Sequence, residues 1–233
     1  MAGDPVVAVL LAAGGGSRMA AGRNKVFLDV GRQPMLAWSL DLFDRVQEVD
    51  AVILVGARAE LSSADRLLKD LGLGQKVKQI VAGGASRQES EWNGLRAAAA
   101  VTGGQGVVLI QDAARPFTPG DLIPRLIAEA RGAGGAILAI PAAPTVVVVD
   151  NGMVTGFPSG LWAAQTPQAF RLAEILAAHE QARQDGFQAT DTAAIYERAG
   201  GTVRVVEGSP DNIKITTPED LERAEAIARR RSA

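Results

Sequence analysis

The residues in this sequence best suited to do chemistry are two cations that follow a glycine-rich turn. The stretch Val9–Phe27 reads VLLAAGGGSRMAAGRNKVF, so an apolar run ends in glycines and is followed by Arg18 and Lys25. Such a turn offers backbone N–H groups to a phosphate, and two nearby cations would neutralise charge on a polyphosphate. The stretch therefore favours phosphoryl or nucleotidyl transfer. A plain glycine turn with two surface cations is the alternative that the stretch alone leaves open.

Two common phosphate-loop patterns are not matched here. The sequence contains no G-x-x-x-x-G-K-[ST] string of the P-loop type. The dinucleotide pattern G-x-G-x-x-G fits Gly14 and Gly16, but Met19 stands where the third glycine is needed for close helix–strand packing. The loop thus disfavours a dinucleotide-dependent oxidoreductase, whereas a transfer enzyme and a nucleotide-binding protein without turnover both stay open.

Further candidate residues follow other predicted strands. Asp112 comes shortly after the apolar run Gly106–Ile110 and is a candidate Mg²⁺ ligand, because Mg²⁺ prefers one or two carboxylates together with phosphate oxygens. Arg115 could contact a second anion, although a helix-capping Asp112 paired with Arg115 is an equal alternative. Lys214 lies between two isoleucines in a predicted short strand, where alternation would direct it alone into a cleft.

Short apolar runs alternate with helical patterns, which predicts β-α-β units and a mostly parallel sheet with helices on both faces. Ligands of such sheets bind at the carboxyl ends of the strands, where the candidate residues lie. The predicted strands are Val6–Leu11, Ala51–Val55, Lys78–Val81, Gly106–Ile110 and Ala136–Ile140.

Typical starting residues predict where several helices begin. Pro34 and the Thr-Pro pairs at Thr118 and Thr217 suit a first turn, and Ser86 with Glu89 forms a capping-box pattern. His179 lies in a further helical pattern and is expected at the surface or partly packed. The stretch Trp162–Phe170 is expected to be a loop fixed by the hydrogen bonds of Gln165, Thr166 and Gln168.

Residues 141–160 break the alternation of strands and helices. They hold a β-branched run, an Asp150-Asn151-Gly152 turn and a second short strand, Met153–Phe157. The pattern predicts a β-hairpin inserted in a single domain that covers residues 1–233. An apolar hairpin that projects from a domain seldom buries itself alone, so we expect a homodimer arm.

Composition excludes several classes of function. The 24 basic and 26 acidic residues leave a net charge of −2, which gives no electrostatic case for nucleic acid or an anionic membrane as the main partner. There is no cysteine and a single histidine, so thiolate sites, disulfides and a Ser-His-Asp triad are disfavoured. No apolar stretch approaches about twenty residues, and the N-terminus has no basic segment of a signal peptide, so a cytoplasmic protein is expected.

Six strings taken together give the chain a resemblance to a known family. LAAGGGSRM with Lys25, VAGGASRQES, DAARPF, LWAAQTPQAF, ATDTA and DNIKITTPEDL stand in this order from about residue 6 to residue 228. In order and spacing the chain resembles the 2-C-methyl-D-erythritol 4-phosphate cytidylyltransferases of the non-mevalonate isoprenoid pathway. The resemblance implies a Rossmann-like three-layer α/β fold of the nucleotide-diphospho-sugar transferase type. It also implies transfer of CMP from CTP to a phosphopolyol with release of pyrophosphate.

The resemblance also implies a role for each matching residue. Arg18 and Lys25 would stabilise the transition state, and Asp112 would hold Mg²⁺ on the CTP phosphates. Lys214 would neutralise charge around the α-phosphate and the acceptor, which Arg115 and Thr145 would face. In this family the hairpin completes the acceptor site of the partner. The CTP site would be shaped by Ala12, Ala13, Gly14, Gly15, Gly83, Gly84, Ser90, Asp112 and Ala113.

The chain departs from the family pattern mainly where the acceptor would bind. Pro144 replaces the aspartate that usually precedes Thr145, and the stretch Val146–Val149 is wholly apolar where a basic residue is usual. Pro158 stands in place of the arginine that clamps the acceptor phosphate, and Asn24 replaces a proline before Lys25. Methylerythritol phosphate is the acceptor that we expect. Another polyol phosphate such as ribitol 5-phosphate, or a CTP-binding paralogue with a degenerate acceptor site, remains an alternative.

Overall fold

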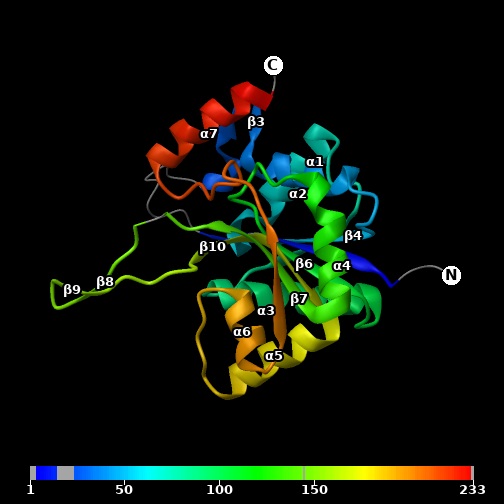
Figure 1. Ribbon diagram of the computed structural model, residues 1–233. Helices are drawn as coiled ribbons and strands as arrows, with labels where there is room; N and C mark the ends of the chain where they lie inside the picture. Colours follow the sequence, from blue (N-terminus) through cyan, green and yellow to red (C-terminus); the bar gives the residue numbers. More distant parts are fainter. Residues whose placement is uncertain (1–3, 15–23, 144, 232–233) are drawn as a thin grey trace.

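A seven-stranded sheet forms the centre of the computed structural model, which describes residues 4–14, 24–143 and 145–231 (Figure 1). The spatial order of the strands is β11-β7-β10-β6-β1-β4-β5. β10 runs antiparallel to both of its neighbours, and the other pairings are parallel. The strands are β1 (Val6–Ala12), β4 (Ala51–Gly56), β5 (Val77–Ala82), β6 (Val107–Asp112), β7 (Gly134–Pro141), β10 (Trp162–Arg171) and β11 (Thr202–Glu207).

The central strands have the nearly continuous apolar sequences of strands that are covered on both faces. Every residue of β1, β4 and β6 is buried. The five predicted strands are all confirmed, with ends that differ from the prediction by one or two residues. One extension matters for the site, because Asp112 is the last residue of β6 and does not lie in the loop beyond it.

Helices cover both faces of the sheet, so the predicted three-layer α/β architecture is confirmed (Figure 1). One face is covered by α1 (Met35–Arg45), α2 (Leu61–Leu71) and α4 (Ile123–Ala133). The other face is covered by α3 (Arg87–Thr102), α5 (Leu172–Gln184) and α6 (Thr192–Arg198). A smaller apolar cluster joins α7 (Pro218–Arg231) to β2 (Asp29–Val30), which pairs with β3 (Gln33–Pro34). Short 3-10 turns lie at Lys25–Phe27, Arg58–Glu60 and Gly120–Leu122.

The predicted helix starts are confirmed at two of the capped positions and wrong at a third. The Ser86 hydroxyl accepts a hydrogen bond from Glu89 N at 3.0 Å, and α3 begins at the next residue. Thr217 caps α7 in the same way through Asp220 N at 3.3 Å. Thr118 does not start a helix, because its hydroxyl is used by buried partners and α4 begins only at Ile123. The helix predicted after Pro34 begins at Met35.

Two local predictions near the site are wrong. Residues 162–170 form most of β10 and not a loop, with the register shifting between Ala164 and Gln168. Proline in a strand usually coincides with such an irregularity, and Pro167 lies within it. Lys214 is not in a strand; it lies in the irregular segment between β11 and α7.

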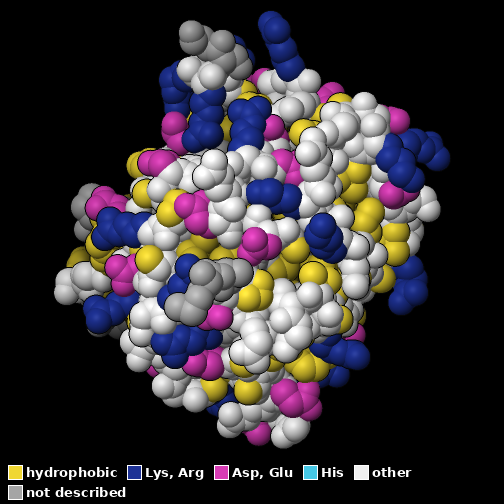
Figure 2. Space-filling model, turned by 90° about the vertical axis from the view of Figure 1, so that its right-hand side faces the viewer, with side chains coloured by type: hydrophobic (Ala, Val, Ile, Leu, Met, Phe, Trp, Pro, Cys, Tyr) yellow, Lys and Arg dark blue, Asp and Glu magenta, His cyan; other side chains and the backbone are white. Residues whose placement is uncertain are grey.

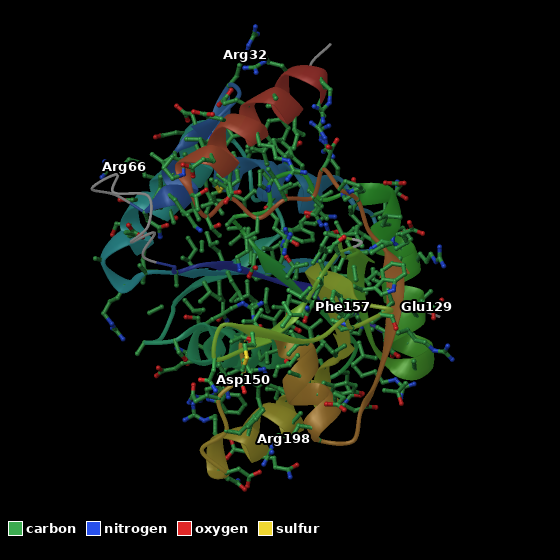
Figure 3. The ribbon with its side chains drawn as sticks, turned by 60° about the vertical axis from the view of Figure 1, so that its left-hand side comes forward. Arg32, Arg66, Glu129, Asp150, Phe157 and Arg198 are labelled. Atoms are coloured by element: carbon green, nitrogen blue, oxygen red, sulfur yellow. The ribbon has the colours of Figure 1, made fainter. Side chains whose placement is uncertain are left out.

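The predicted hairpin projects from the body of the protein (Figure 1). β8 (Val148–Asp150) pairs with β9 (Met153–Gly156) in a separate two-stranded sheet. Asn151 and Gly152 connect them with φ angles of 47° and 79°, the positive values that a tight two-residue hairpin turn requires. Figure 3, in which the hairpin side of the molecule is turned forward, labels Asp150 and Phe157 on its two arms. Pro144 lies outside the described residues.

Within the described ranges, the helices are too short or too polar to cross a lipid bilayer. The face drawn in Figure 2 carries lysine and arginine side chains interspersed with aspartate and glutamate. This mixture of charge signs on that face agrees with the small net charge of the sequence.

Candidate active site

Residues at the carboxyl ends of β1, β5 and β6 line one cavity of about 360 Å³. β1 and β6 are adjacent in the sheet, and β5 is separated from β1 by β4 alone. The residues that follow β1 and β5 and the last residue of β6 therefore meet at one edge, as expected for parallel strands. The cavity is lined by Leu11, Ala13, Gly14, Lys25, Val26, Gly84, Ala85, Ser86, Arg87, Ser90, Asp112, Ala114, Lys214 and Thr216.

The Asp112 carboxylate lies between two cations. Its Oδ2 is 2.6 Å from Lys214 Nζ, and its Oδ1 is 3.3 Å from Arg87 Nε. Burial raises the pKa of the Asp112 carboxyl, but Arg87 and Lys214 lower it by more, so the pKa lies below its ordinary value. The backbone N–H of Asp112 donates to the Thr166 hydroxyl at 3.0 Å, which ties β6 to β10 at this point. Asp112 is therefore an ionised carboxylate held in place at the cavity wall.

Two lysines from distant parts of the sequence face the same cavity. Lys25 begins the 3-10 turn that precedes β2, and its ammonium donates to the Ile215 carbonyl at 2.7 Å. This bond joins the segment after the glycine loop to the segment that carries Lys214. The predicted direction of Lys214 into a cleft is confirmed, although an irregular segment and not strand alternation produces it.

Two glycines are needed after β5 because neighbouring side chains lie too close to leave room for a Cβ atom. A Cβ at Gly83 would lie 2.5 Å from Ala13 Cβ, and a Cβ at Gly84 would lie 2.2 Å from Glu89 Cγ. Gly84 N donates to the Ser90 hydroxyl at 3.1 Å, so Ser90 fixes the backbone that lines the cavity. The contacts thus give the glycine pair a structural role in the packing at this end of β5. Whether these backbone groups also hold a nucleotide stays a prediction.

Several other candidate residues are not found on the lining of the cavity. Ala12, Gly83 and Ala113 lie behind the lining and not on it. Gly15 and Arg18 lie outside the described residues. Thr145 is exposed at the base of the hairpin and is not brought to the cavity.

Arg115 also lies off the cavity lining, and its contacts tie three segments together. Its guanidinium donates to the Asn212 carbonyl at 2.7 Å and to the Ala164 carbonyl at 3.2 Å. Burial lowers the pKa of the Arg115 guanidinium below its ordinary value. Arg115 therefore holds the segment before Lys214 against β10, whereas the alternative of a direct Arg115–Asp112 ion pair at a helix cap is not what the contacts show.

Sequence reasoning missed Arg87, which lines the cavity and bridges two carboxylates. Besides Asp112, it contacts Glu91 through Nη1 at 2.7 Å. The available signal was the spacing of Arg87 and Glu91, which places them one turn apart at the start of a capped helix. His179 was expected near the surface, but the structure places it fully buried beside Glu91, with its Nε2 3.8 Å from Glu91 Oε2.

The donor set suits a cation that arrives with phosphate ligands. Among the described residues, no three histidine, cysteine, aspartate or glutamate side chains cluster to enclose a metal ion. Of the described residues that line the cavity, Asp112 is the one that offers a carboxylate. Mg²⁺ is commonly bound through one or two carboxylates with substrate phosphates and water as its other ligands, so the residues present fit this ion.

Comparison with known proteins agrees with this geometry. Residues 6–230 match the family model of the 2-C-methyl-D-erythritol 4-phosphate cytidylyltransferases (IspD). The chain belongs to this family. The enzyme of that name from Geobacter metallireducens is 46% identical over 224 residues, which cover 95% of this chain and 97% of the relative. The one from Geobacillus kaustophilus is 44% identical over 228 residues and covers 97% and 98% of the two chains.

Solved structures of the cytidylyltransferase family share the fold. The 4-diphosphocytidyl-2C-methyl-D-erythritol synthase of Anaerococcus prevotii superposes with a TM-score of 0.85 at 31% identity, over 97% of this chain and 96% of the other. The 2-C-methyl-D-erythritol 4-phosphate cytidylyltransferase of Thermus thermophilus gives a TM-score of 0.74 at 30% identity, with 95% and 98% covered. The resemblance drawn from six short strings is therefore confirmed over nearly the whole chain.

One departure of this cytidylyltransferase from its family pattern has a structural explanation. Asn24, which replaces proline, is buried, and its amide donates to the Ala12 carbonyl at 2.8 Å and to Glu60 Oε2 at 2.7 Å. Its Oδ1 accepts from Val26 N at 3.3 Å and caps the turn that begins at Lys25. Asn24 thus fixes the start of the lysine segment by side-chain bonds, where a proline would fix it by its ring.

Proposed function

We propose that the protein transfers CMP from CTP to 2-C-methyl-D-erythritol 4-phosphate and releases pyrophosphate. The observation that carries this proposal is the cavity in which Lys25, Lys214 and Asp112 face one another beside the backbone of Gly14 and Gly84. Two ammonium groups and one carboxylate suit a triphosphate with a divalent cation. Membership of the family supplies the identity of nucleotide and acceptor.

The proposed step exchanges one phosphoanhydride bond for another. A phosphate oxygen of the acceptor attacks the α-phosphorus of CTP, and the bond from that phosphorus to the bridging oxygen of the β-phosphate breaks. The electron pair leaves with pyrophosphate. Since the second pKa of a phosphate monoester is about 6, the nucleophile is already ionised near neutral pH and needs no general base. The lack of a histidine among the described residues of the cavity lining is therefore compatible with the reaction.

Each cavity residue then has a role in charge neutralisation. Lys25, with Arg18 from the glycine loop, binds the β- and γ-phosphates and stabilises the charge that develops on the leaving pyrophosphate. Lys214 binds the α-phosphate side, where the acceptor phosphate approaches. Asp112 would hold Mg²⁺, which when bound supplies positive charge to the triphosphate oxygens. Gly14, Gly15, Gly84 and the residues behind them offer backbone groups to the nucleotide.

The acceptor half of the site is proposed to need a second copy of the chain. The hairpin is apolar and exposed, with Val149 at 55%, Met153 at 67% and Phe157 at 77% exposure. None of its described residues lines the cavity of its own chain. An apolar arm of this kind is typical of a protein–protein contact, so we propose that it packs on a partner copy and brings Thr145 toward the partner's cavity.

The experiment that tests the proposal is an acceptor panel. The protein is incubated with CTP, Mg²⁺ and a set of sugar and polyol phosphates, and pyrophosphate release is measured. Release with methylerythritol phosphate is expected. Pyrophosphate release with ribitol 5-phosphate alone would overturn the assignment of methylerythritol phosphate as acceptor. CTP binding without pyrophosphate release for any acceptor would identify a nucleotide-binding protein without turnover. A cytoplasmic location and the absence of nucleic-acid or membrane partners stay predictions from the sequence.

A further inference from the structure

A buried carboxylate lies directly behind the cavity and has no role in the reaction described above. Glu91 is 1% exposed and lies one turn after Arg87 on α3. Its Oε1 accepts a hydrogen bond from the Thr192 hydroxyl at the start of α6 and contacts Arg87 Nη1 at 2.7 Å. An ionisable group is seldom placed so deep unless it is paired, and its partner here is a residue of the cavity lining.

Arg87 divides its nitrogens between two carboxylates. Its Nη1 faces Glu91, whereas its Nε contacts the Oδ1 atom of Asp112, at 3.3 Å. The other oxygen, Oδ2, contacts Lys214 Nζ at 2.6 Å. Arginine can clamp a carboxylate with two parallel N–H groups, and such a clamp on Asp112 would occupy both oxygens. The contact with Glu91 turns the guanidinium fork away from that arrangement.

The groups around Glu91 keep Arg87 as its cationic partner. His179 of α5 lies 3.8 Å away, and neither of its ring nitrogens has a hydrogen-bond partner among the described residues. Burial, together with Arg87 and Arg183, lowers the pKa of His179 to about 4, so this ring is neutral near pH 7. Asp191, which caps α6, and Asp112, at the end of β6, add negative charge near Glu91. Arg87 is thus the cation that contacts both the Glu91 and the Asp112 carboxylates.

We infer that Glu91 is a positioning residue: by holding one end of Arg87, it restricts Arg87 to a single oxygen of Asp112 and leaves the other oxygen to exchange Lys214 for the divalent cation. The inference rests on the proposed function, since it concerns the site of the CTP-bound cation. Lys214 is the more accessible member of this arrangement, because its side chain is 38% exposed while that of Asp112 is 10% exposed.

The test uses binding of Mn²⁺ and CTP without acceptor, so that no turnover occurs. Free aqueous Mn²⁺ is followed by electron paramagnetic resonance in wild type, Glu91→Gln, Arg87→Lys and the double variant. Groups that orient a metal ligand typically contribute about 10- to 100-fold to metal affinity, and we expect a loss of that size in Glu91→Gln. Binding of CTP without metal, measured by calorimetry, is expected to change little. Glu180→Gln, an exposed change on α5, is the matched control and should bind like wild type.

A double-mutant cycle separates positioning from general damage. If Glu91 acts through Arg87, the double variant should bind Mn²⁺ no more weakly than Arg87→Lys alone. Additive losses, or wild-type Mn²⁺ affinity in a folded Glu91→Gln, would overturn the inference. If circular dichroism shows that Glu91→Gln does not fold, the Mn²⁺ affinity of Arg87→Lys tests the inference by itself. This variant keeps the positive charge but lacks the two-pronged guanidinium. Wild-type Mn²⁺ affinity in Arg87→Lys would then overturn the inference. A wild-type protein that binds neither CTP nor Mn²⁺–CTP would instead refute the proposed function.

Discussion

Lys214 Nζ lies 2.6 Å from Asp112 Oδ2, so an ion pair across the cavity joins the segment before α7 to the end of β6. In the proposed function, a divalent cation bound to the same oxygen would compete with this ammonium, and a displaced Lys214 would be available to the phosphates of the nucleotide. On that proposal one carboxylate would serve two cations in turn, and the ion pair would couple binding of the metal to release of the lysine.

Asp112→Asn removes the charge for which both cations compete. We expect the Mg²⁺ concentration that gives half-maximal activity to rise by about 100-fold, the equivalent of about 3 kcal/mol for a lost charged contact. Initial rates over a Mg²⁺ series at saturating CTP measure this change. An unchanged Mg²⁺ requirement with a lower maximal rate would show that Asp112 acts on the reaction in some other way.

Lys25→Ala should reduce turnover far more than it reduces CTP binding. Removal of one preorganised group that stabilises transition-state charge typically lowers kcat by about 10²- to 10³-fold, and we expect a loss in this range. Pyrophosphate release gives kcat, and calorimetry gives the CTP dissociation constant. Lys69→Ala, an exposed change on α2, is the control. Equal losses in kcat and in CTP affinity would mean that Lys25 only binds ground-state CTP.

The buried pair Glu91 and His179 should give opposite pH dependences of stability. Burial raises the pKa of Glu91 from 4.5 to about 7, whereas burial lowers that of His179 from 6.5 to about 4. The folded state therefore binds the Glu91 proton more tightly, which makes the protein less stable as pH rises from about 4.5 to about 7. The unfolded state binds the His179 proton more tightly, which makes the protein less stable as pH falls from about 6.5 to about 4.

Single substitutions would separate these two contributions. In Glu91→Gln the free energy of unfolding should rise with pH between about 4.5 and about 6.5, and in His179→Gln it should fall over the same interval. Urea titrations at several pH values provide the measurement, and Glu180→Gln should follow the wild-type profile. Slopes of the same sign in both variants would contradict the assignment of charge states.

Pro158→Arg would restore the arginine that the family pattern places on the hairpin. A charged hydrogen bond to a phosphate contributes about 1.5–3 kcal/mol, so KM for methylerythritol phosphate should fall by about 10- to 100-fold. KM for CTP should not move, because the described residues of the hairpin do not line the nucleotide cavity. A KM for the acceptor that stays unchanged would indicate that another cation already occupies this role.

Met153→Asp tests the hairpin as a dimer arm. Met153 is 67% exposed on β9, and a charge placed in an apolar interface should weaken association by about 100-fold. Sedimentation velocity reports the shift from dimer to monomer, and acceptor turnover should fall with it. Val101→Asp on α3, at 37% exposure, is the control. A wild-type protein that is monomeric at all concentrations tested would contradict the proposal that the hairpin completes the acceptor site of a partner copy.

The sequence predicted the sheet well because its strands are continuous apolar runs, and the parallel order then placed Gly14, Gly84 and Asp112 at one edge. It did not predict the edge strand β11, and it did not predict β10, in which Gln165, Pro167 and Gln168 obscure the strand pattern and the register shifts. The sequence also did not predict the burial of His179. It results from the packing of α3, α5 and α6 on one another, which no local pattern records.

The position of Arg87 in the site could not be predicted from the sequence either, because it depends on tertiary packing. Its i,i+4 pairing with Glu91 looks like an ordinary surface ion pair on a helix. Glu91 is buried and Arg87 reaches Asp112 because α3 begins beside the end of β6 and α6 packs over Glu91 through Thr192. The direction of a helix start is a tertiary property, so the chemistry of Arg87 could be recognised only in three dimensions.

The bond from Lys25 to the Ile215 carbonyl makes the finished cavity depend on the C-terminal part of the chain. Chains emerge from the ribosome with the N-terminal part first, so the glycine loop, Lys25 and Asp112 are exposed to the cell well before Lys214 is made. Until the segment before α7 docks, Asp112 lacks one of its two cations and the cavity lacks a wall. The active site of a nascent chain is therefore incomplete until the C-terminal segment that carries Lys214 has been made.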